Sequence, residues 1–196
     1  MANSRLAAAC AAFDALNAAD PQKEIVDGVE RPRLLVQAER LARWVERLEP
    51  EASEALRLAA HCQHLERWKI PRSDFPEGRV GYLTWRTELG RFHAKRAQEV
   101  LAELGYDEAT LGAVGHILTK QNLRSNHDSQ TMEDALCLVF LEYELDEFMQ
   151  KYPDEDKAIV ILQKTWKKMS ARGHEAALAL PLGDRAKALV GRALGG

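Results

Sequence analysis

Histidines and arginines gather in residues 60–72, AHCQHLERWKIPR, where they could act on one ligand. His61 and His64 are three residues apart, as are His64 and Arg67, which is the spacing of neighbours on one helix face. Arg72 lies just past the end of the predicted helix. Arginine pairs with phosphate or carboxylate through parallel hydrogen bonds, and histidine ligates a metal or moves a proton. The segment predicts a site for an anionic ligand, and the alternative is ordinary surface charge with Trp68 anchoring the loop.

A second group of aromatic and cationic side chains lies in residues 81–97, GYLTWRTELGRFHAKRA. Tyr82, Trp85 and Arg86 could form an aromatic and cationic wall for a ring and a phosphate. Trp85 and Phe92 are seven apart, which is also the spacing of a core stripe, and we expect Phe92 to be core. His93 beside it is either a buried, hydrogen-bonded histidine or a ligand.

The third group comprises Lys120, Gln130, Glu133 and Asp134. A carboxylate at the start of a buried helix could hold a metal or orient a base. A capping box from Thr131 to Asp134 would explain the same pattern without a function.

Helical periodicity runs through almost the whole sequence, and no alternating β-branched run interrupts it. We therefore predict an all-α, HD-like fold of about seven or eight helices, forming a single domain over residues 1–196. Residues 71–82, with two prolines and two glycines, must be a loop, and such loops frequently carry function. We interpret residues 21–32 as a polar connection. The predicted helices are 4–18, 32–48, 51–68, 83–104, 107–120, one that includes the apolar segment 135–141, 154–169, and one from 184.

Composition excludes several classes of protein. The 196 residues carry 27 lysines and arginines against 30 acidic residues, and this net charge of −3 provides no global field to hold bulk nucleic acid. Three widely spaced cysteines, Cys10, Cys62 and Cys137, indicate reduced thiols and a cytoplasmic location. No segment approaches the roughly 20 apolar residues of a membrane-spanning helix, so no membrane association is expected.

The chain resembles an uncharacterised helical family known as domain of unknown function 4202. The resemblance implies a helical fold over most of the chain, but no settled activity. It rests on residues 63–72, 81–86, His93, Lys120, 130–142 and 164–170.

More remotely, the arrangement is similar to HD-type phosphohydrolases, in which histidines and aspartates on separate helices bind one or two divalent ions. In one register, His64 corresponds to the histidine of the doublet, His93 and Lys120 to later positions, and Asp134 to the final aspartate. In the other, His64 is the first histidine, His93 belongs to the doublet, and Asp134 is the last ligand. The resemblance thus implies a divalent metal ion on His64, His93 and Asp134.

Both registers lack the doublet aspartate, because Leu65 or Ala94 stands in its place and neither side chain can ligate a metal. Two outcomes stay open: a reduced metal site, or a metal-free pocket. The side chains expected to line the pocket are Arg67, Arg72, Arg86 and Lys120.

The leading functional hypothesis is a metal-dependent phosphohydrolase for a small phosphorylated or nucleotide-like ligand, with Glu133, Asp134 and Lys120 in catalytic roles. The alternative is a non-catalytic binding or regulatory module without a metal. A nucleophilic thiol comes third, because Cys62 near His61 has no obvious orienting partner in the sequence. The residues expected to bind the ligand are Gln63, Arg67, Arg72, Tyr82, Trp85 and Arg86.

Overall fold

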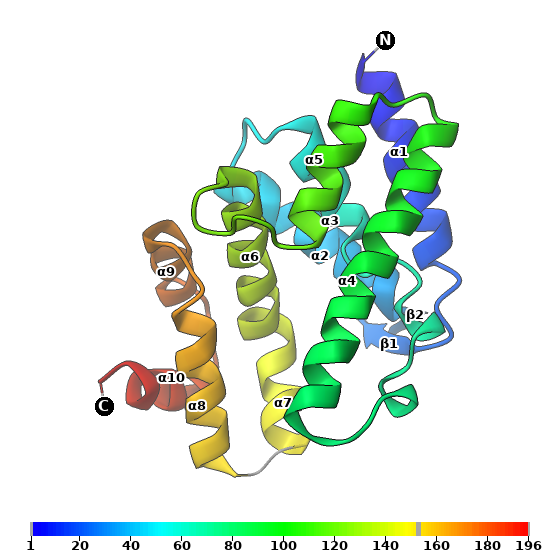
Figure 1. The fold of residues 1–196 in the computed structure, drawn as a ribbon. Coiled ribbons are helices and arrows are strands. Elements are labelled where there is room, and N and C mark those ends of the chain that lie inside the picture. The colour runs from blue at the N-terminus through cyan, green and yellow to red at the C-terminus, as the bar shows by residue number, and fades with distance from the viewer. Residues whose placement is uncertain (1, 152–153, 196) are drawn as a thin grey trace. The chain divides into compact units, whose positions relative to one another are not determined.

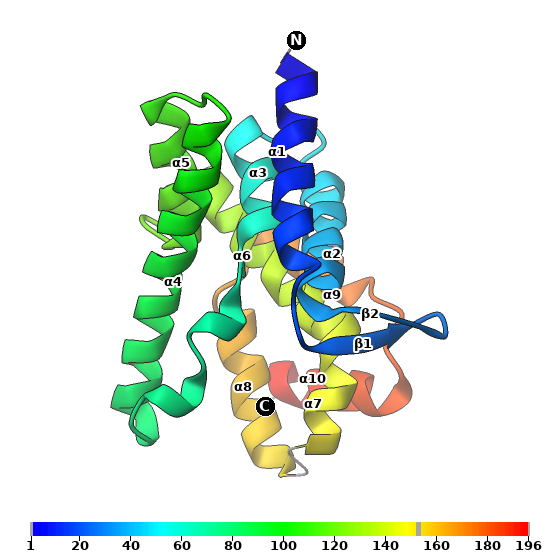
Figure 2. The same ribbon diagram turned by 90° about the vertical axis from the view of Figure 1, so that its right-hand side faces the viewer.

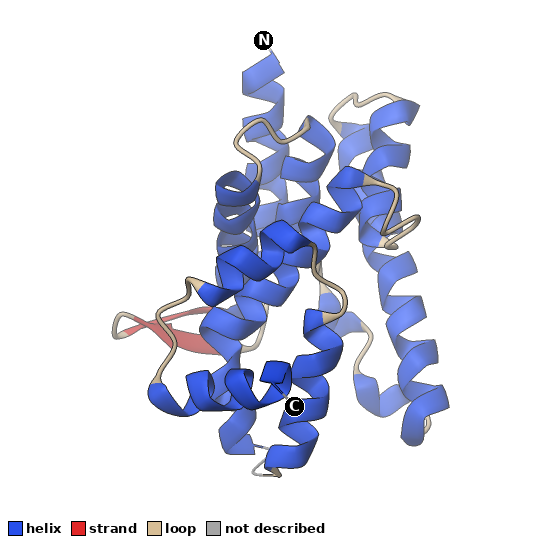
Figure 3. Ribbon diagram, turned by 90° about the vertical axis from the view of Figure 1, so that its left-hand side faces the viewer, coloured by secondary structure: helices blue, strands red, loops and turns tan. Residues whose placement is uncertain are grey.

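The structure of the chain is a computed structural model, which describes residues 2–151 and 154–195. The fold is all-α, as predicted, and its only described strands form one two-stranded hairpin (Figures 1 and 3). Internal contacts divide the chain into two compact units, residues 1–132 and 133–196. The single domain over residues 1–196 stays a prediction.

Three helices pack against one another in the first unit (Figure 2): α1 (Ala2–Asn17), α2 (Arg33–Leu48) and α3 (Glu54–Cys62). The apolar residues of α2 recur at helical intervals, and Leu41 and Val45 are each 1% exposed. Ser53 caps α3, since its side chain accepts a hydrogen bond from the backbone N–H of Leu56 at 3.0 Å. Helix α3 therefore begins three residues later than predicted.

Residues 21–32 connect α1 and α2 as predicted, but they contain a β-hairpin that was not predicted. Strand β1 (Lys23–Val26) pairs antiparallel with β2 (Val29–Pro32). Asp27 and Gly28 form the two-residue turn, and both have positive φ angles, of 51° and 79°. An Asp-Gly pair between apolar residues is a strong hairpin signal, and it was present in the sequence.

The segment after α3 is less regular than predicted. Helix α3 ends at Cys62, and residues 67–69 and 72–74 form two short 3-10 turns. Helix α4 (Gly78–Glu103) begins five residues before the predicted 83, inside the expected loop. Gly81 permits this start, because a Cβ there would lie 1.9 Å from the Pro76 carbonyl oxygen. Helix α5 (Glu108–Leu118) packs along α4.

Helix α6 (His127–Val139) begins in the first unit and continues into the second. Asn126 lies at its N-terminus, where the side-chain oxygen accepts a hydrogen bond from the backbone N–H of Ser129 at 2.8 Å. A capping box from Thr131 is therefore wrong, because this residue lies inside the helix. The second unit continues with a π-helical segment Phe140–Glu144, α7 (Leu145–Lys151), α8 (Glu155–Trp166), α9 (Ala171–Leu178) and α10 (Asp184–Gly195).

Among the described residues, no helix combines the length and the apolar character needed to cross a membrane. Cys10, Cys62 and Cys137 form no disulfide, as predicted. The cytoplasmic location stays a prediction.

Candidate functional site

Two of the predicted metal ligands, His64 and His93, lie next to each other in the first unit. His64 is in the turn after α3, and His93 is in the middle of α4. Their ring centroids are 6.2 Å apart, with an angle of 86° between the ring planes. Nδ1 of His93 lies 2.8 Å from the Leu65 carbonyl oxygen, which can only accept. Nδ1 therefore carries the proton, and Nε2 of the neutral ring is a bare acceptor.

Three polar atoms at this position have no hydrogen-bond partner among the described residues, although all are buried. They are Nδ1 of His64, Nε2 of His93 and the side-chain oxygen of Gln63. A buried polar atom without a partner costs about 1–3 kcal/mol, and such atoms are rare in native structures unless water or a ligand satisfies them. Their grouping at one place marks the turn after α3 as the candidate site.

Both rings are electrically neutral at pH 7. Burial lowers the pKa of His93 to about 4, against the hydrogen bond to Leu65 and with a further contribution from the charge of Arg67. Burial also holds the pKa of His64 well below its usual value, and the positive charges of Arg67, Lys120 and Arg86 act in the same direction. The neutral pair thus lies in a strongly positive environment.

Two of the predicted binding residues, Arg67 and Arg86, and the predicted catalytic residue Lys120 supply that positive charge. Arg67 lies over the ring of Trp85, 4.8 Å from its centroid. Arg86 donates to the Tyr82 hydroxyl at 3.2 Å, one turn away on α4. Together with Lys120, which follows α5, these cations come from three segments of the first unit and all act on His64.

The acidic residue of this turn, Glu66, is paired with two cationic side chains. Its carboxylate accepts from Lys69 at 2.5 Å and from Arg96 at 2.9 Å. Although burial acts in the opposite direction, these hydrogen bonds lower the pKa of Glu66, so it stays ionised. This group was not predicted, and the Glu66–Lys69 spacing of three is its only local signal in the sequence.

Two backbone positions at the site have the left-handed conformation, which non-glycine residues rarely adopt. The φ angles are 52° at Glu66 and 56° at Lys120. Such residues cost on the order of 1–3 kcal/mol and concentrate at functional sites. Glu66 lies between the turn that contains His64 and the 3-10 turn that begins at Arg67. Its left-handed conformation changes the direction of the chain at this point.

The other predicted binding residues support the loop. Arg72 donates to the carbonyl oxygens of Phe75 and Pro76, both at 2.8 Å. Trp85 is 9% exposed, and its indole N–H donates to the Ile70 carbonyl oxygen at 2.9 Å. Tyr82 is 43% exposed on the first turns of α4. Their ligand-binding roles stay predictions.

Asp134, predicted as a metal ligand and catalytic residue, is in the second unit and is fully buried. Its two oxygens accept from the backbone N–H of Ser170 at 2.8 Å and from the Ser170 hydroxyl at 2.5 Å. Gly173 leaves room for this carboxylate, because a Cβ there would lie 2.7 Å from it. Asp134 thus holds the turn before α9, where Ser170 caps the helix. Glu133 pairs with Lys168 at 3.6 Å.

A metal fits these residues only in part. Two neutral imidazole nitrogens without partners suit a divalent ion, but known zinc sites use three or four protein ligands. Within the described ranges, no three His, Cys, Asp or Glu side chains group closely enough to hold a metal. The neighbouring side chains are cations, which repel one. No chemical step is therefore derived through a metal.

Comparison with known proteins identifies the family of the chain. No curated protein matches the chain, and no solved structure matches it. A family model described as Domain of unknown function (DUF4202) matches residues 7–190, almost the entire length. This agrees with the segments that suggested the resemblance, and the chain belongs to the DUF4202 family.

Proposed function

We propose that the first unit binds a small phosphorylated ligand at the His64–His93 pair, without a metal. The observation that carries the proposal is the set of three side-chain cations, Arg67, Arg86 and Lys120, around a half-buried, neutral His64. A phosphate would compensate this positive charge, and arginine is suited to bind it through two parallel hydrogen bonds.

The buried polar atoms without hydrogen-bond partners indicate which groups the ligand carries besides its phosphate. Nε2 of His93 and the side-chain oxygen of Gln63 are acceptors, and they require donors. A fully ionised phosphate has none, whereas a sugar hydroxyl or a base amine supplies them. The combination favours a phosphorylated sugar or a nucleotide over inorganic phosphate.

The test is ligand-induced thermal stabilisation, measured with adenosine monophosphate, ribose 5-phosphate and inorganic phosphate. A ligand that binds only the folded state raises Tm with concentration. We expect the two organic phosphates to stabilise the protein more than inorganic phosphate does.

Arg86→Ala should weaken binding by about tenfold, the effect of losing one charged hydrogen bond. Arg91→Ala is the matched control, because Arg91 lies on the same helix, is exposed, and pairs with Glu88. If all three compounds leave Tm unchanged, or if both variants respond alike, the proposal is wrong.

A metal-dependent phosphohydrolase, as the HD-type resemblance implies, is the second candidate. It is favoured by the two neutral ring nitrogens of His64 and His93 without partners. Elemental analysis of protein purified without chelators tests it, together with phosphatase assays with and without added manganese. Near-stoichiometric metal that is lost in His64→Ala and His93→Ala would support it. Metal-free protein without phosphatase activity would contradict it.

A further inference from the structure

The β-hairpin between α1 and α2 forms a sheet of two strands, and no other described strand covers either of its edges. Its turn projects away from α1 and α2 (Figure 2). Edge strands expose backbone N–H and C=O groups that can pair with another chain, and natural proteins usually protect them. On β2 the protection is Pro32, which has no N–H to donate. Strand β1 contains no proline, and its Ile25 is 77% exposed, so β1 is the open edge.

The register of the hairpin determines which backbone groups lie on this open edge. The backbone N–H of Arg33 donates to the Gln22 carbonyl oxygen at 2.9 Å, so residues 22 and 33 form a hydrogen-bonded pair. Such pairs alternate along an antiparallel ladder, and the next ones are residues 24 and 31 and residues 26 and 29. Lys23 and Ile25 therefore direct their backbone N–H and C=O groups away from β2.

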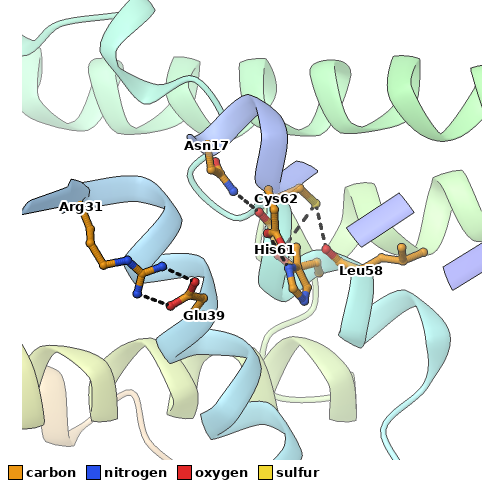
Figure 4. A network of polar contacts seen from close by, with 8 residues as sticks. Asn17, Arg31, Glu39, Leu58, His61 and Cys62 are labelled. Atoms are coloured by element: carbon orange, nitrogen blue, oxygen red, sulfur yellow. Dashed lines mark hydrogen bonds and ion pairs between the residues drawn. The ribbon is translucent and has the colours of Figure 1, made fainter. Parts of the chain in front are cut away.

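Ion pairs to α2 hold the hairpin from one face. Arg31 on β2 donates two hydrogen bonds to the Glu39 carboxylate on α2, at 2.6 and 3.0 Å (Figure 4). Arg40 on α2 pairs with Glu24 on β1 at 2.7 Å. Successive side chains of a strand point to opposite faces, so Ile25 lies on the face away from these ion pairs. The strand is thus held extended before a partner binds, which lowers the entropic cost of pairing.

The open edge is complementary to a second copy of itself. In an antiparallel register centred on Ile25, this residue lies opposite Ile25 of the second copy, and their backbones exchange two hydrogen bonds. Lys23 then lies opposite Asp27 of the second copy, so opposite charges meet at both ends of the contact. The Lys23 ammonium group donates to the Asp20 carbonyl oxygen at 2.8 Å and retains two further donors. A shift of two residues towards the start of the strand would place Glu24 opposite Glu24, which opposes pairing.

We propose that the open edge of β1 joins two copies of this chain through an antiparallel β1–β1 contact. The contact extends the two hairpins into one four-stranded sheet, and a sheet of three or more strands is more stable than a single hairpin. Each copy contributes a strand of only four residues, which buries far less than the roughly 1,200 Å² of a standard interface. The dimer is therefore weak and reversible, with a dissociation constant on the order of 0.1 mM.

Sedimentation equilibrium of the full chain, from about 10 µM to 1 mM, measures this association. We expect the apparent mass to rise from that of a monomer towards that of a dimer. Ile25→Pro removes the outward N–H but no hydrogen bond within the hairpin, so it should raise the dissociation constant at least about tenfold. Glu30→Pro is the matched control, because Glu30 pairs with Ile25 and directs its N–H to the edge of β2. This variant should associate like the wild type, and circular dichroism checks that both variants fold.

Asp27→Asn tests the charge pairing of the proposed register. Asn-Gly is a preferred hairpin turn, so the variant retains the turn while it removes the charge opposite Lys23. We expect association at low salt to weaken about threefold, the effect of losing an exposed ion pair.

Ile25→Cys tests the register by cross-linking, since opposed residues of a hydrogen-bonded pair have Cα atoms about 5.5 Å apart, within the range of a disulfide. We expect mild oxidation to link this variant through position 25 of both copies. Val29→Cys, at a 59% exposed position of β2, is the matched control, and the wild type with its free cysteines gives the background. A monomeric mass at all concentrations, wild-type association of Ile25→Pro or Asp27→Asn, or equal cross-linking of Ile25→Cys and Val29→Cys would overturn the proposal.

Discussion

His61 and His64 are only three positions apart, yet their electrostatic environments are opposite. His61 faces α1, where the hydrogen bond to Asp14 and the neighbouring Cys10 outweigh burial and raise its pKa to about 10. His64 lies in the turn after α3, where burial and the charges of Arg67 and other cations hold its pKa well below the usual value. Both residues are histidines in one short segment. The difference between their pKa values therefore comes from the elements that lie against each ring.

The charged and the neutral histidines of this short segment are suited to two kinds of chemistry. A charged ring such as that of His61 donates protons and pairs with anions of the protein itself. A neutral ring such as that of His64 or His93 offers a lone pair, and the cations beside it attract an anionic ligand. The proposed phosphate site depends on the neutral state of His64 and His93.

The largest expected effect is a loss of stability at high pH that depends on His61. Its pKa is higher in the folded state than in the unfolded state, where it is near 6.5. Its contribution is therefore fully present below pH 6.5 and is lost as the pH rises through about 10. The loss is on the order of 4 kcal/mol.

Urea unfolding of wild type and His61→Gln across this range measures the contribution. The difference in the free energy of unfolding should be largest at about pH 6.5 and should shrink towards pH 10. A difference independent of pH would show that His61 is uncharged in the folded protein, and it would remove the contrast with His64.

The opposite dependence is expected for His93, whose pKa is lowered to about 4 by burial. The unfolded state takes up the proton more readily, so the contribution of this histidine to stability is full above pH 6.5 and is lost as the pH falls towards 4. The expected loss is on the order of 3 kcal/mol.

His93→Asn provides the comparison, because its amide N–H can still donate to the Leu65 carbonyl oxygen. In this variant, unfolding should depend less on pH between about 4 and 6.5 than in the wild type. The same pH dependence in both proteins would contradict the neutral, buried state of His93.

A smaller effect is expected from Arg67→Met, which removes one charge and retains an apolar side chain against Trp85. Arg67 lowers the pKa of both His64 and His93, so both pKa values should rise in the variant. Titration of the imidazole Cε1–H signals by NMR measures this, and His61 is the internal control. If His61 moved as much as the other two, the change would reflect altered folding.

Much of the fold could be predicted from the sequence, because helix periodicity is a local property. Helix α2 lies within one residue of its predicted bounds. The hairpin was missed because its strands are only four residues long, although Asp27-Gly28 is a hairpin turn signal. The early start of α4 depends on the close approach of Pro76 to Gly81, a tertiary contact that no periodicity shows.

Several residues of the candidate site could be predicted from the sequence, but the residues that they contact could not. His64, His93 and Arg67 were singled out by type and spacing, and the structure brings them together. The partner of Asp134 is Ser170, 36 positions later, and this carboxylate was assigned to a metal instead. Likewise, the sequence drew attention to Cys62 beside His61, whereas the ring of His61 hydrogen-bonds to Asp14, 47 positions earlier.

The smallest effect is expected at Gln63, which is 5% exposed and lies next to His64. Its side-chain oxygen is buried without a partner in the described structure, so Gln63→Met removes an unsatisfied acceptor and retains the volume. We expect the free energy of unfolding to stay unchanged or to rise by up to about 1 kcal/mol, while stabilisation by adenosine monophosphate decreases. Urea unfolding with and without the nucleotide measures both. A loss of more than about 1.5 kcal/mol without ligand would mean that bound water satisfies this oxygen in the free protein, because removing an unsatisfied group cannot cost that much.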